Sequence, residues 1–290
     1  MGLRLKFNLV LIAVFAVGIA CSAFISQRIL QQNAKDEVKR NASLMMESAM
    51  AVRDYTVSQV KPNLELQLMR VFLPQSVPAY AATEVFNNLR KTYPEYTYKE
   101  ATLNPTNPRD KTVEWEADIV NQFRNNPDGP KEVDGERETP SGPALFRARP
   151  IKITNEKCLV CHSTVDNAPK SMIQLYGPAN GFGWKPNEII GAQVISVPMA
   201  VPLAKADAAF RTFLLSLLAV FLLAFIVLNI TLSVMVIRPI VRMSRDADEV
   251  STGNLQIPEF AVRSKDEIGI LATSFNRLRR SLEKAMKLLE

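Results

Sequence analysis

The sequence predicts an α+β fold, in which an antiparallel sheet with flanking helices is joined to two transmembrane helices and followed by a dimeric helical bundle. Three observations lead to this prediction. Two apolar stretches, Phe7–Ile25 and Thr212–Ile237, carry no charge and are long enough to cross a bilayer as helices. The segment between them changes from helix-like to strand-like patterns. The residues after 238 repeat apolar side chains at coiled-coil spacing.

Basic residues flank both apolar stretches and predict their orientation. Arg4 and Lys6 lie at the start of the N-terminal transmembrane segment, residues 1–25, and Arg238 follows the second stretch. By the positive-inside rule, we expect both chain termini in the cytoplasm and residues 26–211 in the periplasm, with the inner (cytoplasmic) membrane between them. The first stretch also fits a cleaved signal peptide, which has the same basic start and short apolar run.

The charge of the chain is basic but diffuse. Lys and Arg number 35 against 29 Asp and Glu, which gives a net charge of +6. No strongly basic face emerges, so the excess is better explained by the membrane flanks than by nucleic acid. We therefore expect a membrane and protein partners, and no nucleic-acid partner.

The first part of the external segment is expected to be helical. Residues 26–72 are rich in Gln, Ala, Glu, Lys, Leu and Met and favour a long helix that continues from the first span, kinked at Pro62. A second helix is expected over Tyr80–Lys91, introduced by Pro74 and Pro78.

The rest of the external domain, residues 73–211, shows strand and turn patterns. Helices followed by strands with long connections are typical of an α+β domain built on an antiparallel sheet. We expect strands at Tyr93–Tyr98, Ala144–Ile153 and Glu188–Val197, a helix at Thr112–Phe123, a turn at Asn104–Pro108 and a loop region at Asn125–Pro143.

Two of the three cysteines and the single histidine lie together in Cys158-Leu159-Val160-Cys161-His162. C-x-x-C-H is the attachment signature of c-type haem. In such a site both thiols form thioethers with the porphyrin vinyl groups, and the adjacent imidazole becomes the proximal iron ligand. The predicted external location agrees with this chemistry, because attachment takes place on the outer face of the membrane. We expect one covalently attached haem c, with His162 as a metal ligand.

Two other kinds of site use cysteine pairs, but each explains the motif less completely. A structural zinc site needs four ligands, but Cys21 lies far away in an apolar stretch and there is no second histidine. A thioredoxin-like redox pair needs only the two thiols, and nothing in its chemistry requires this histidine. Haem attachment accounts for all three side chains.

Several separated segments together carry a resemblance to a known family. They are Arg53-Asp54-Tyr55-Thr56, Pro78-Ala79-Tyr80-Ala81-Ala82, Glu100 to Pro108, the C-x-x-C-H motif and Asn180-Gly181-Phe182-Gly183-Trp184-Lys185. Over about residues 40–202 the chain resembles the external domain of the Tll0287-like (DUF3365) family. The resemblance implies a PAS-like fold with one covalently attached c-type haem.

The sixth iron ligand and the lining of the haem pocket are less specific in the sequence. Met50 is the candidate ligand, because it lies with Met45 and Met46 on the helix that the family uses for its distal side; a vacant or water-bound position is equally open. Arg53 is expected to pair with a propionate, and Trp184 and Tyr176 to pack on the porphyrin. Further candidates are Met172, Met199, Phe182, Trp115, Arg147 and Arg149.

The C-terminal segment, residues 238–290, resembles a HAMP domain, a dimeric four-helix signal converter. It has Arg238-Pro239-Ile240 at its start, a Gly253-Asn254-Leu255 connector and Asp266-Glu267 at the start of its second helix. An apolar seam with alternating spacings of three and four is typical of a coiled coil. The seam consists of Ile268, Leu271, Phe275, Leu278, Leu282, Ala285 and Leu289.

These features predict a membrane-anchored haem sensor, which is a signal-transduction protein and not an enzyme, because no catalytic acid or base is recognisable beside the haem motif. Redox change or a diatomic gas at the external haem would pass through a transmembrane helix to a HAMP homodimer and then to a separate partner protein. The alternative is a monohaem c-type cytochrome that carries electrons or serves a larger membrane redox complex.

Overall fold

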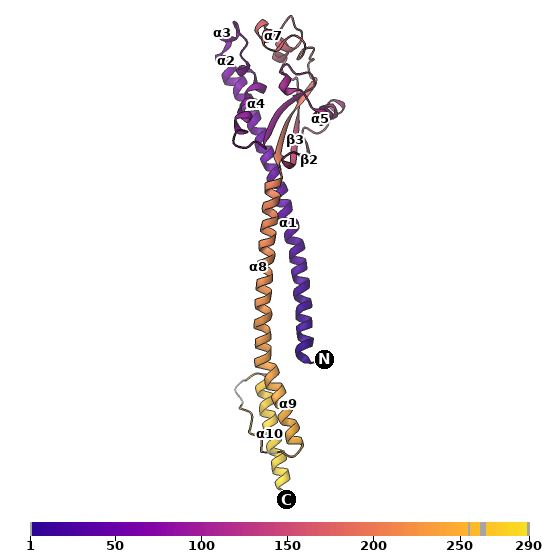
Figure 1. The fold of residues 1–290 in the computed structure, drawn as a ribbon, viewed down its shortest axis with the longest axis vertical. Helices are drawn as coiled ribbons and strands as arrows, with labels where there is room; N and C mark the ends of the chain where they lie inside the picture. The colour runs from indigo at the N-terminus through magenta and orange to yellow at the C-terminus, as the bar shows by residue number, and fades with distance from the viewer. Residues whose placement is uncertain (1, 255, 262–264, 289–290) are drawn as a thin grey trace. The chain divides into compact units, whose positions relative to one another are not determined.

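The computed structural model describes residues 2–254, 256–261 and 265–288. The chain divides into two compact units (Figure 1). One comprises residues 27–209, and the other comprises residues 1–26 together with residues 210–290. Each unit is described separately below. Leu255 and Leu289, which the sequence places in the HAMP connector and seam, lie outside the described residues.

The first unit contains a four-stranded sheet in which every neighbouring pair of strands is antiparallel. The strand order is β1-β4-β3-β2. This arrangement confirms the predicted α+β class and its antiparallel sheet. The strands are β1 (Thr97–Thr102), β2 (Val133–Thr139), β3 (Gly142–Lys152) and β4 (Ile189–Pro198).

The helices differ greatly in length. Two are long: α1 (Leu3–Tyr55) and α8 (Ala200–Leu232). The others are α2 (Lys61–Asn63), α3 (Glu65–Leu68), α4 (Pro78–Leu89), α5 (Glu114–Asn125), α6 (Leu159–His162), α7 (Lys170–Tyr176), α9 (Arg238–Ser251) and α10 (Glu267–Lys287).

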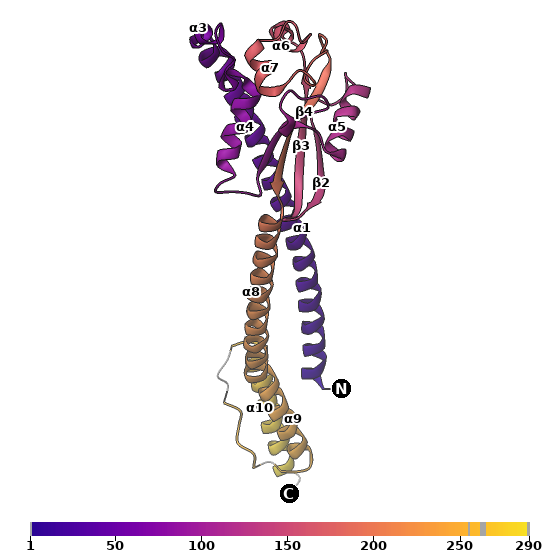
Figure 2. The ribbon, with the colours of Figure 1, turned by 45° about the horizontal axis from the view of Figure 1, so that its top comes forward.

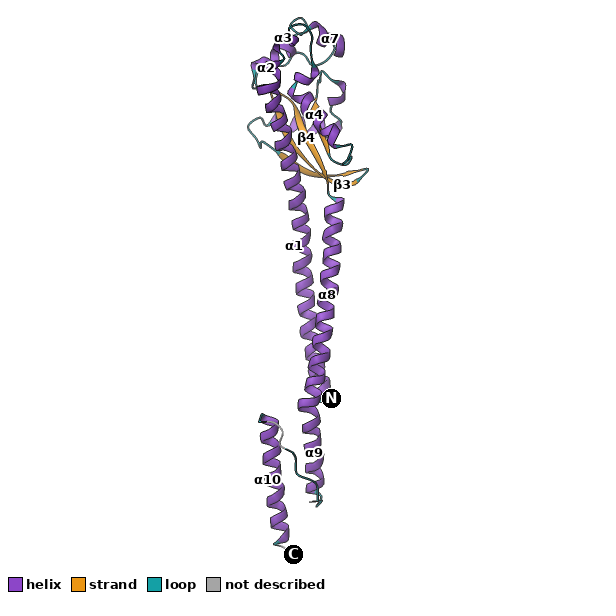
Figure 3. Cartoon of the chain, turned by 90° about the vertical axis from the view of Figure 1, so that its left-hand side faces the viewer, coloured by secondary structure: helices purple, strands orange, loops and turns teal. Residues whose placement is uncertain are grey.

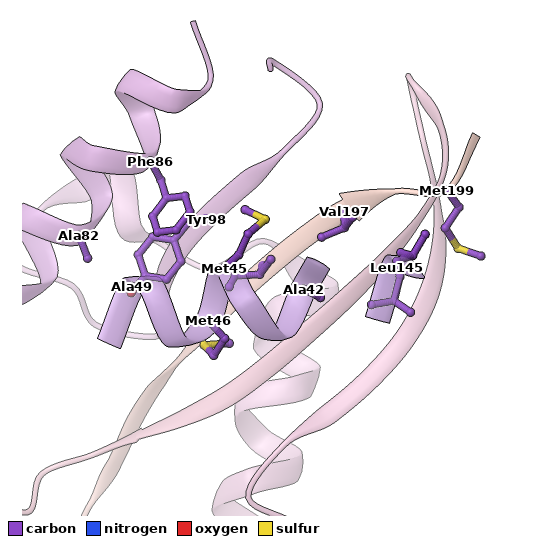
Figure 4. Packing of buried hydrophobic residues seen from close by; sticks show 12 residues of the cluster. Ala42, Met45, Met46, Ala49, Ala82, Phe86, Tyr98, Leu145, Val197 and Met199 are labelled. Carbon is purple, nitrogen blue, oxygen red and sulfur yellow. The ribbon is translucent and has the colours of Figure 1, made fainter. Parts of the chain in front are cut away.

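The sheet has a hydrophobic core on each face. Alternate residues of β1, β3 and β4 belong to different cores, because successive side chains of a strand point to opposite faces of the sheet. The first core lies between the sheet and helices α1 and α4, where the rings of Phe86 and Tyr98 stack with centroids 4.9 Å apart (Figure 4). The second lies between the other face and α5, where Val120 and Phe123 pack on Ala148 and Val194. The part of α1 from Val38 to Ala49 therefore forms one side of the first core.

Ion pairs also fasten α1 across the strands at the β2 side of the sheet. The Lys35 ammonium lies 2.9 Å from a Glu136 carboxylate oxygen, and the Glu47 carboxylate lies 2.8 Å from the Arg149 guanidinium. Arg149 also pairs with Glu132. Buried apolar residues of α1, from Val38 to Ala49, lie along the same side of the helix.

Two strand predictions need correction. The strand expected at Tyr93–Tyr98 begins at Thr97, because Pro94 lies in a turn closed by the bond from Tyr96 N–H to Tyr93 C=O. The predicted loop at Asn125–Pro143 contains the whole of β2. Acidic residues occupy every second position of this edge strand, so its composition resembles that of a charged loop. The Asp134 carboxylate accepts two 2.7 Å hydrogen bonds from Arg147 of β3.

A π-helical turn directly follows each of the two long helices and ends two residues before a proline. Thr56–Val60 precedes Pro62, and Ser233–Ile237 precedes Pro239. Proline lacks an N–H and its ring crowds the carbonyl four residues earlier, and one wider turn accommodates both effects. The expected irregularity at Pro62 is thus a π-turn, after which the helix ends near Leu64.

The second unit holds the N-terminal part of α1, most of α8, and helices α9 and α10 (Figure 3). The helical stretches Arg4–Asn63 and Ala200–Ser251 are both long and apolar enough to cross a membrane by length and composition. Within this unit, Phe15 of α1 contacts Phe221 of α8, with ring centroids 4.7 Å apart.

Helices α9 and α10 pack together at the C-terminal end of the second unit. The Asp266 side chain caps α10 by accepting from the Gly269 N–H, as its place at the start of the predicted helix suggests. The Asn276 side-chain amide makes two 3.0 Å hydrogen bonds with the backbone of Phe260 and so ties the connector to α10.

Candidate haem-attachment site

The C-x-x-C-H motif lies in the long connection between β3 and β4. Its ends are closed by backbone bonds from Asn187 N–H to Ile153 C=O, 2.8 Å, and from Ile153 N–H to Glu188 C=O, 2.9 Å. Between these bonds the chain forms α6 and α7, which lie beyond one end of the strands (Figure 2). The sheet therefore supports the motif as a rigid base.

Cys158 and Cys161 bracket the first turn of α6. Residues three apart on a helix lie on the same side, so both thiols are offered to one ligand. Both are free and half-buried. Burial raises the pKa of the Cys161 thiol, against the opposing charge of Lys61, and the nearby Cys158 raises it further.

The imidazole of His162 is oriented by a backbone carbonyl. Its Nδ1 lies 2.7 Å from the carbonyl oxygen of Gly181. A carbonyl can only accept, so Nδ1 carries the proton and Nε2 keeps its lone pair. Burial lowers the pKa of His162, and the hydrogen bond to Gly181 opposes this effect. The ring is thus a neutral imidazole with Nε2 as its donor atom.

Trp184 packs directly on this imidazole. The ring centroids lie 3.9 Å apart and the planes are 14° from parallel. The backbone N–H of Trp184 also donates to the His162 carbonyl at 3.2 Å, and the backbone N–H of Gly183 donates to the Ser163 carbonyl at 3.0 Å. The indole therefore fixes the orientation of the histidine ring, which sequence reasoning did not foresee when it assigned Trp184 to the porphyrin.

The turn after β1 supplies two further neighbours of the histidine. The Thr106 hydroxyl lies 3.4 Å from His162 Nδ1. The Asn104 side chain contacts the backbone of Gly181 and Phe182. Sequence reasoning gave these two residues no role beyond the family resemblance. Two Asn-Pro pairs mark the turn, but nothing in the sequence connects them with the Gly-rich tract.

Met50 and Arg53 lie together on α1, in a buried polar network with the sheet. The Arg53 guanidinium pairs with Glu100, whose carboxylate also accepts from the Tyr98 hydroxyl at 2.6 Å. The Gln193 side-chain amide lies 3.4 Å from the Met50 sulfur and 3.3 Å from the Tyr98 hydroxyl. The contacts of Met50 and Arg53 are thus with β1 and β4.

Tyr176 belongs to a different group, at the end of α7. Its ring meets Phe72 edge-on, with centroids 6.2 Å apart. The Ser171 hydroxyl accepts from the Phe72 N–H at 2.7 Å, so α7 and the segment after α3 are joined there. Burial raises the pKa of Tyr176, with smaller effects from neighbouring charges that include Arg109 and Asp110.

The remaining candidates have ordinary structural surroundings. The Trp115 ring packs against Phe146 at a tilt of 53°, and the Arg137 guanidinium lies 4.1 Å from the Trp115 ring centroid. Arg147 and Arg149 pair with acidic residues of the β2 side. The other candidate methionines are buried: Met45, Met46 and Met199 lie in the core beneath α1, and Met172 lies in α7.

Comparison with known proteins agrees with this organisation. The HAMP domain model matches residues 232–284. An α+β domain joined to a HAMP domain is the arrangement of a signal-transducing sensor. The Tll0287-like family model matches residues 31–198, more than half of the chain, so the chain belongs to the Tll0287-like family.

One solved structure is also similar. The crystal structure of the cyanobacterial heme-protein Tll0287 is 16% identical, with a TM-score of 0.42, and the match covers 56% of this chain and 95% of that one. No curated protein matches the chain.

Proposed function

We propose that this chain is a membrane-anchored sensor with one c-type haem, held by thioethers to Cys158 and Cys161 and by iron ligation through His162. The observation that carries the proposal is the histidine geometry. The bond from Nδ1–H to the Gly181 carbonyl leaves Nε2 as the donor, beside two free thiols on one helical turn. Membership of the Tll0287-like family supports the same assignment.

The chemistry of the donor set also favours haem over a bare ion. Within the described part of the chain, no group of three or more His, Cys, Asp or Glu side chains is placed to hold a metal. A metal at His162 therefore needs a ligand that brings its own donors. A bound haem would supply the four porphyrin nitrogens and a redox-active iron, and the protein would supply the His162 imidazole and the covalent attachment.

The distal side is proposed with two alternatives. Met50 is the candidate sixth ligand, since a thioether would raise the potential, and its sulfur is already oriented by Gln193. The other alternative is an open position that binds a gas or water. Arg53 is the proposed propionate partner, because a guanidinium has donors beyond the one that binds Glu100. Trp184 and Tyr176 are proposed to bound the pocket.

The signal path is proposed from chain continuity. Helix α1 carries the Met50–Arg53 region and continues back into residues 1–25; β4 carries Gln193 and is followed directly by α8. Both elements joined by the Met50–Gln193 contact therefore lead to apolar stretches that we propose as transmembrane segments, 1–25 and 212–237. We propose that residues 73–211 lie in the periplasm and that residues 238–290 lie in the cytoplasm, as a HAMP homodimer that acts on a separate partner.

Covalent haem is tested by denaturation. The full chain, expressed with c-type maturation factors, is expected to keep haem-dependent peroxidase stain on a denaturing gel and to show a pyridine haemochrome of the thioether type. Cys158→Ala and Cys161→Ala should each weaken the stain, and the double variant should lose it. Cys21→Ala, the matched control, should stain like wild type. A wild-type chain without stain would overturn the proposal.

Spectra of the reduced protein with and without CO or NO separate the sensor from a cytochrome. A shift on adding gas indicates a sixth position that opens, as a gas sensor needs. A permanently six-coordinate haem that exchanges electrons rapidly supports an electron carrier instead. Met50→Leu should change the reduced spectrum if Met50 is the ligand and leave it unchanged if the position is open.

A further inference from the structure

The side chain of Asn104 binds the backbone on both sides of the peptide that orients His162. Its Oδ1 accepts from the Gly181 N–H at 3.1 Å, and its Nδ2 donates to the Phe182 carbonyl at 3.2 Å. The assignment of oxygen and nitrogen is unambiguous, because an N–H must donate and a carbonyl must accept. Between these two anchored groups lies the Gly181 carbonyl, the acceptor for His162.

Gly181 and Thr106 complete this arrangement. Gly181 has φ +86°, a conformation that favours glycine, and a Cβ there would overlap the Thr106 hydroxyl and lie 2.8 Å from the Thr106 Cα. The close approach keeps the Thr106 hydroxyl 3.4 Å from His162 Nδ1. The turn after β1 and the Gly-rich tract are therefore packed backbone to backbone around one hydrogen bond.

We infer that Asn104 is a positioning residue for the iron ligand: it holds the Gly181 carbonyl against His162 Nδ1–H and thereby fixes the tautomer and basicity of the imidazole. The inference rests on the proposed haem function for its effect on the iron. Partners that bind the second nitrogen of a metal-bound histidine set its orientation and raise its basicity. A more basic axial ligand favours ferric over ferrous iron, so Asn104 keeps the haem potential low.

The chain offers a matched control in the same turn. Asn107 is also half-buried. Its Oδ1 accepts from the Arg109 N–H at 3.2 Å, so this bond stabilises a local turn and does not involve Gly181. Asn104→Ala and Asn107→Ala therefore remove the same side chain three residues apart. Asn104→Asp is an intermediate variant, because a carboxylate still accepts from the Gly181 N–H and cannot donate to the Phe182 carbonyl.

The first measurement is the midpoint potential of the full-length holoprotein. Asn104→Ala is expected to shift the ferric–ferrous equilibrium toward ferrous by roughly three- to tenfold, where tenfold equals about 59 mV for one electron. Asn107→Ala should shift it by less than about twofold, and Asn104→Asp should lie between. A folded Asn104→Ala protein with the wild-type potential, or an equal shift in Asn107→Ala, overturns the inference.

The second measurement needs no haem. The chain has one histidine, so ¹⁵N-histidine labelling of the full chain without haem reports His162 alone. Wild type is expected to hold the proton on Nδ1, and Asn104→Ala to populate both tautomers. Identical tautomers in the two proteins overturn the inference. If wild type takes up no haem, the proposed function fails while this comparison still decides the role of Asn104; if Asn104→Ala does not fold, Asn104→Asp takes its place in both experiments.

Discussion

Arg53 of α1 and Glu100 of β1 form an ion pair within the unit that contains the sheet, and Glu100 is only 4% exposed. Removing one partner of a buried pair leaves an uncompensated charge, which costs far more than an exposed pair does. Arg53→Met should therefore lower the free energy of unfolding by about 3–5 kcal/mol. Urea unfolding measures this change.

Two comparisons test that explanation. The double variant Arg53→Met with Glu100→Leu removes both charges and should recover most of the loss. Lys35→Met breaks the exposed pair with Glu136 and should cost at most about 1 kcal/mol. Equal losses from Arg53→Met and Lys35→Met would show that burial of Glu100 is not the cause.

Asp110 should make stability depend on pH. Burial raises the pKa of its carboxyl to about 6, against the opposing charges of Arg109 and Lys99. Because the folded state then keeps a proton that the unfolded chain has released, the free energy of unfolding falls as pH rises from about 4 to about 6. Above that range the loss is complete and constant.

Asp110→Asn removes this contribution. The variant should match wild type near pH 4 and exceed its free energy of unfolding by on the order of 1–2 kcal/mol near pH 7, after allowance for solvent screening. Denaturant unfolding of both proteins across this pH range gives the difference. A difference that stays constant with pH contradicts the assignment to Asp110.

Gly181 should tolerate alanine much less well than Gly183, two residues along. Both have positive φ, but a Cβ at Gly183 meets nothing within 4 Å, whereas at Gly181 it overlaps Thr106. Gly183→Ala should cost about 1 kcal/mol for its backbone conformation alone. Gly181→Ala should cost at least about 2 kcal/mol more and reduce haem attachment, read from thermal unfolding and from haem stain. Similar melting temperatures for the two variants would be evidence against the close packing.

The apolar seam of α10 should bind a second copy of the chain. Leu278 is 59% exposed in the single chain, while Ala272 and Asn276 of the same helix are buried. In a Cys21→Ala background, Leu278→Cys should form a disulfide-linked dimer under mild oxidation. Lys284→Cys, on the opposite side of α10, should cross-link far less. Equal yields from both positions would exclude a specific seam.

Sequence patterns predicted those parts of the fold in which composition and period agree. The strand at Ala144–Ile153 matches β3 and the strand at Glu188–Val197 matches β4, because each contains several apolar residues and is bounded by turn residues. Strand β2 was missed because its residues Val133–Thr139 resemble a charged loop, and only pairing with β3 makes it a strand. Long-range pairing of this kind leaves little trace in local composition.

The site shows the same division. Cys158, Cys161 and His162 are adjacent, so a short motif identifies them. Asn104, Thr106 and Gly181 meet His162 only through the fold, from segments far apart in the chain. The Glu100 partner of Arg53 is likewise invisible locally, since it depends on where α1 crosses β1. Contacts between distant segments need a structure.

The π-turns before Pro62 and Pro239 have a consequence for rotation along a helix. One residue of an α-helix corresponds to about 100° around the axis, so an extra residue in a single turn offsets every later side chain by a comparable angle. The turn Ser233–Ile237 therefore sets the rotation of the α9 side chains about the helix axis relative to those of α8. The phase of the apolar stripe on α9 therefore depends on the effect that Pro239 has on the backbone at the start of that helix.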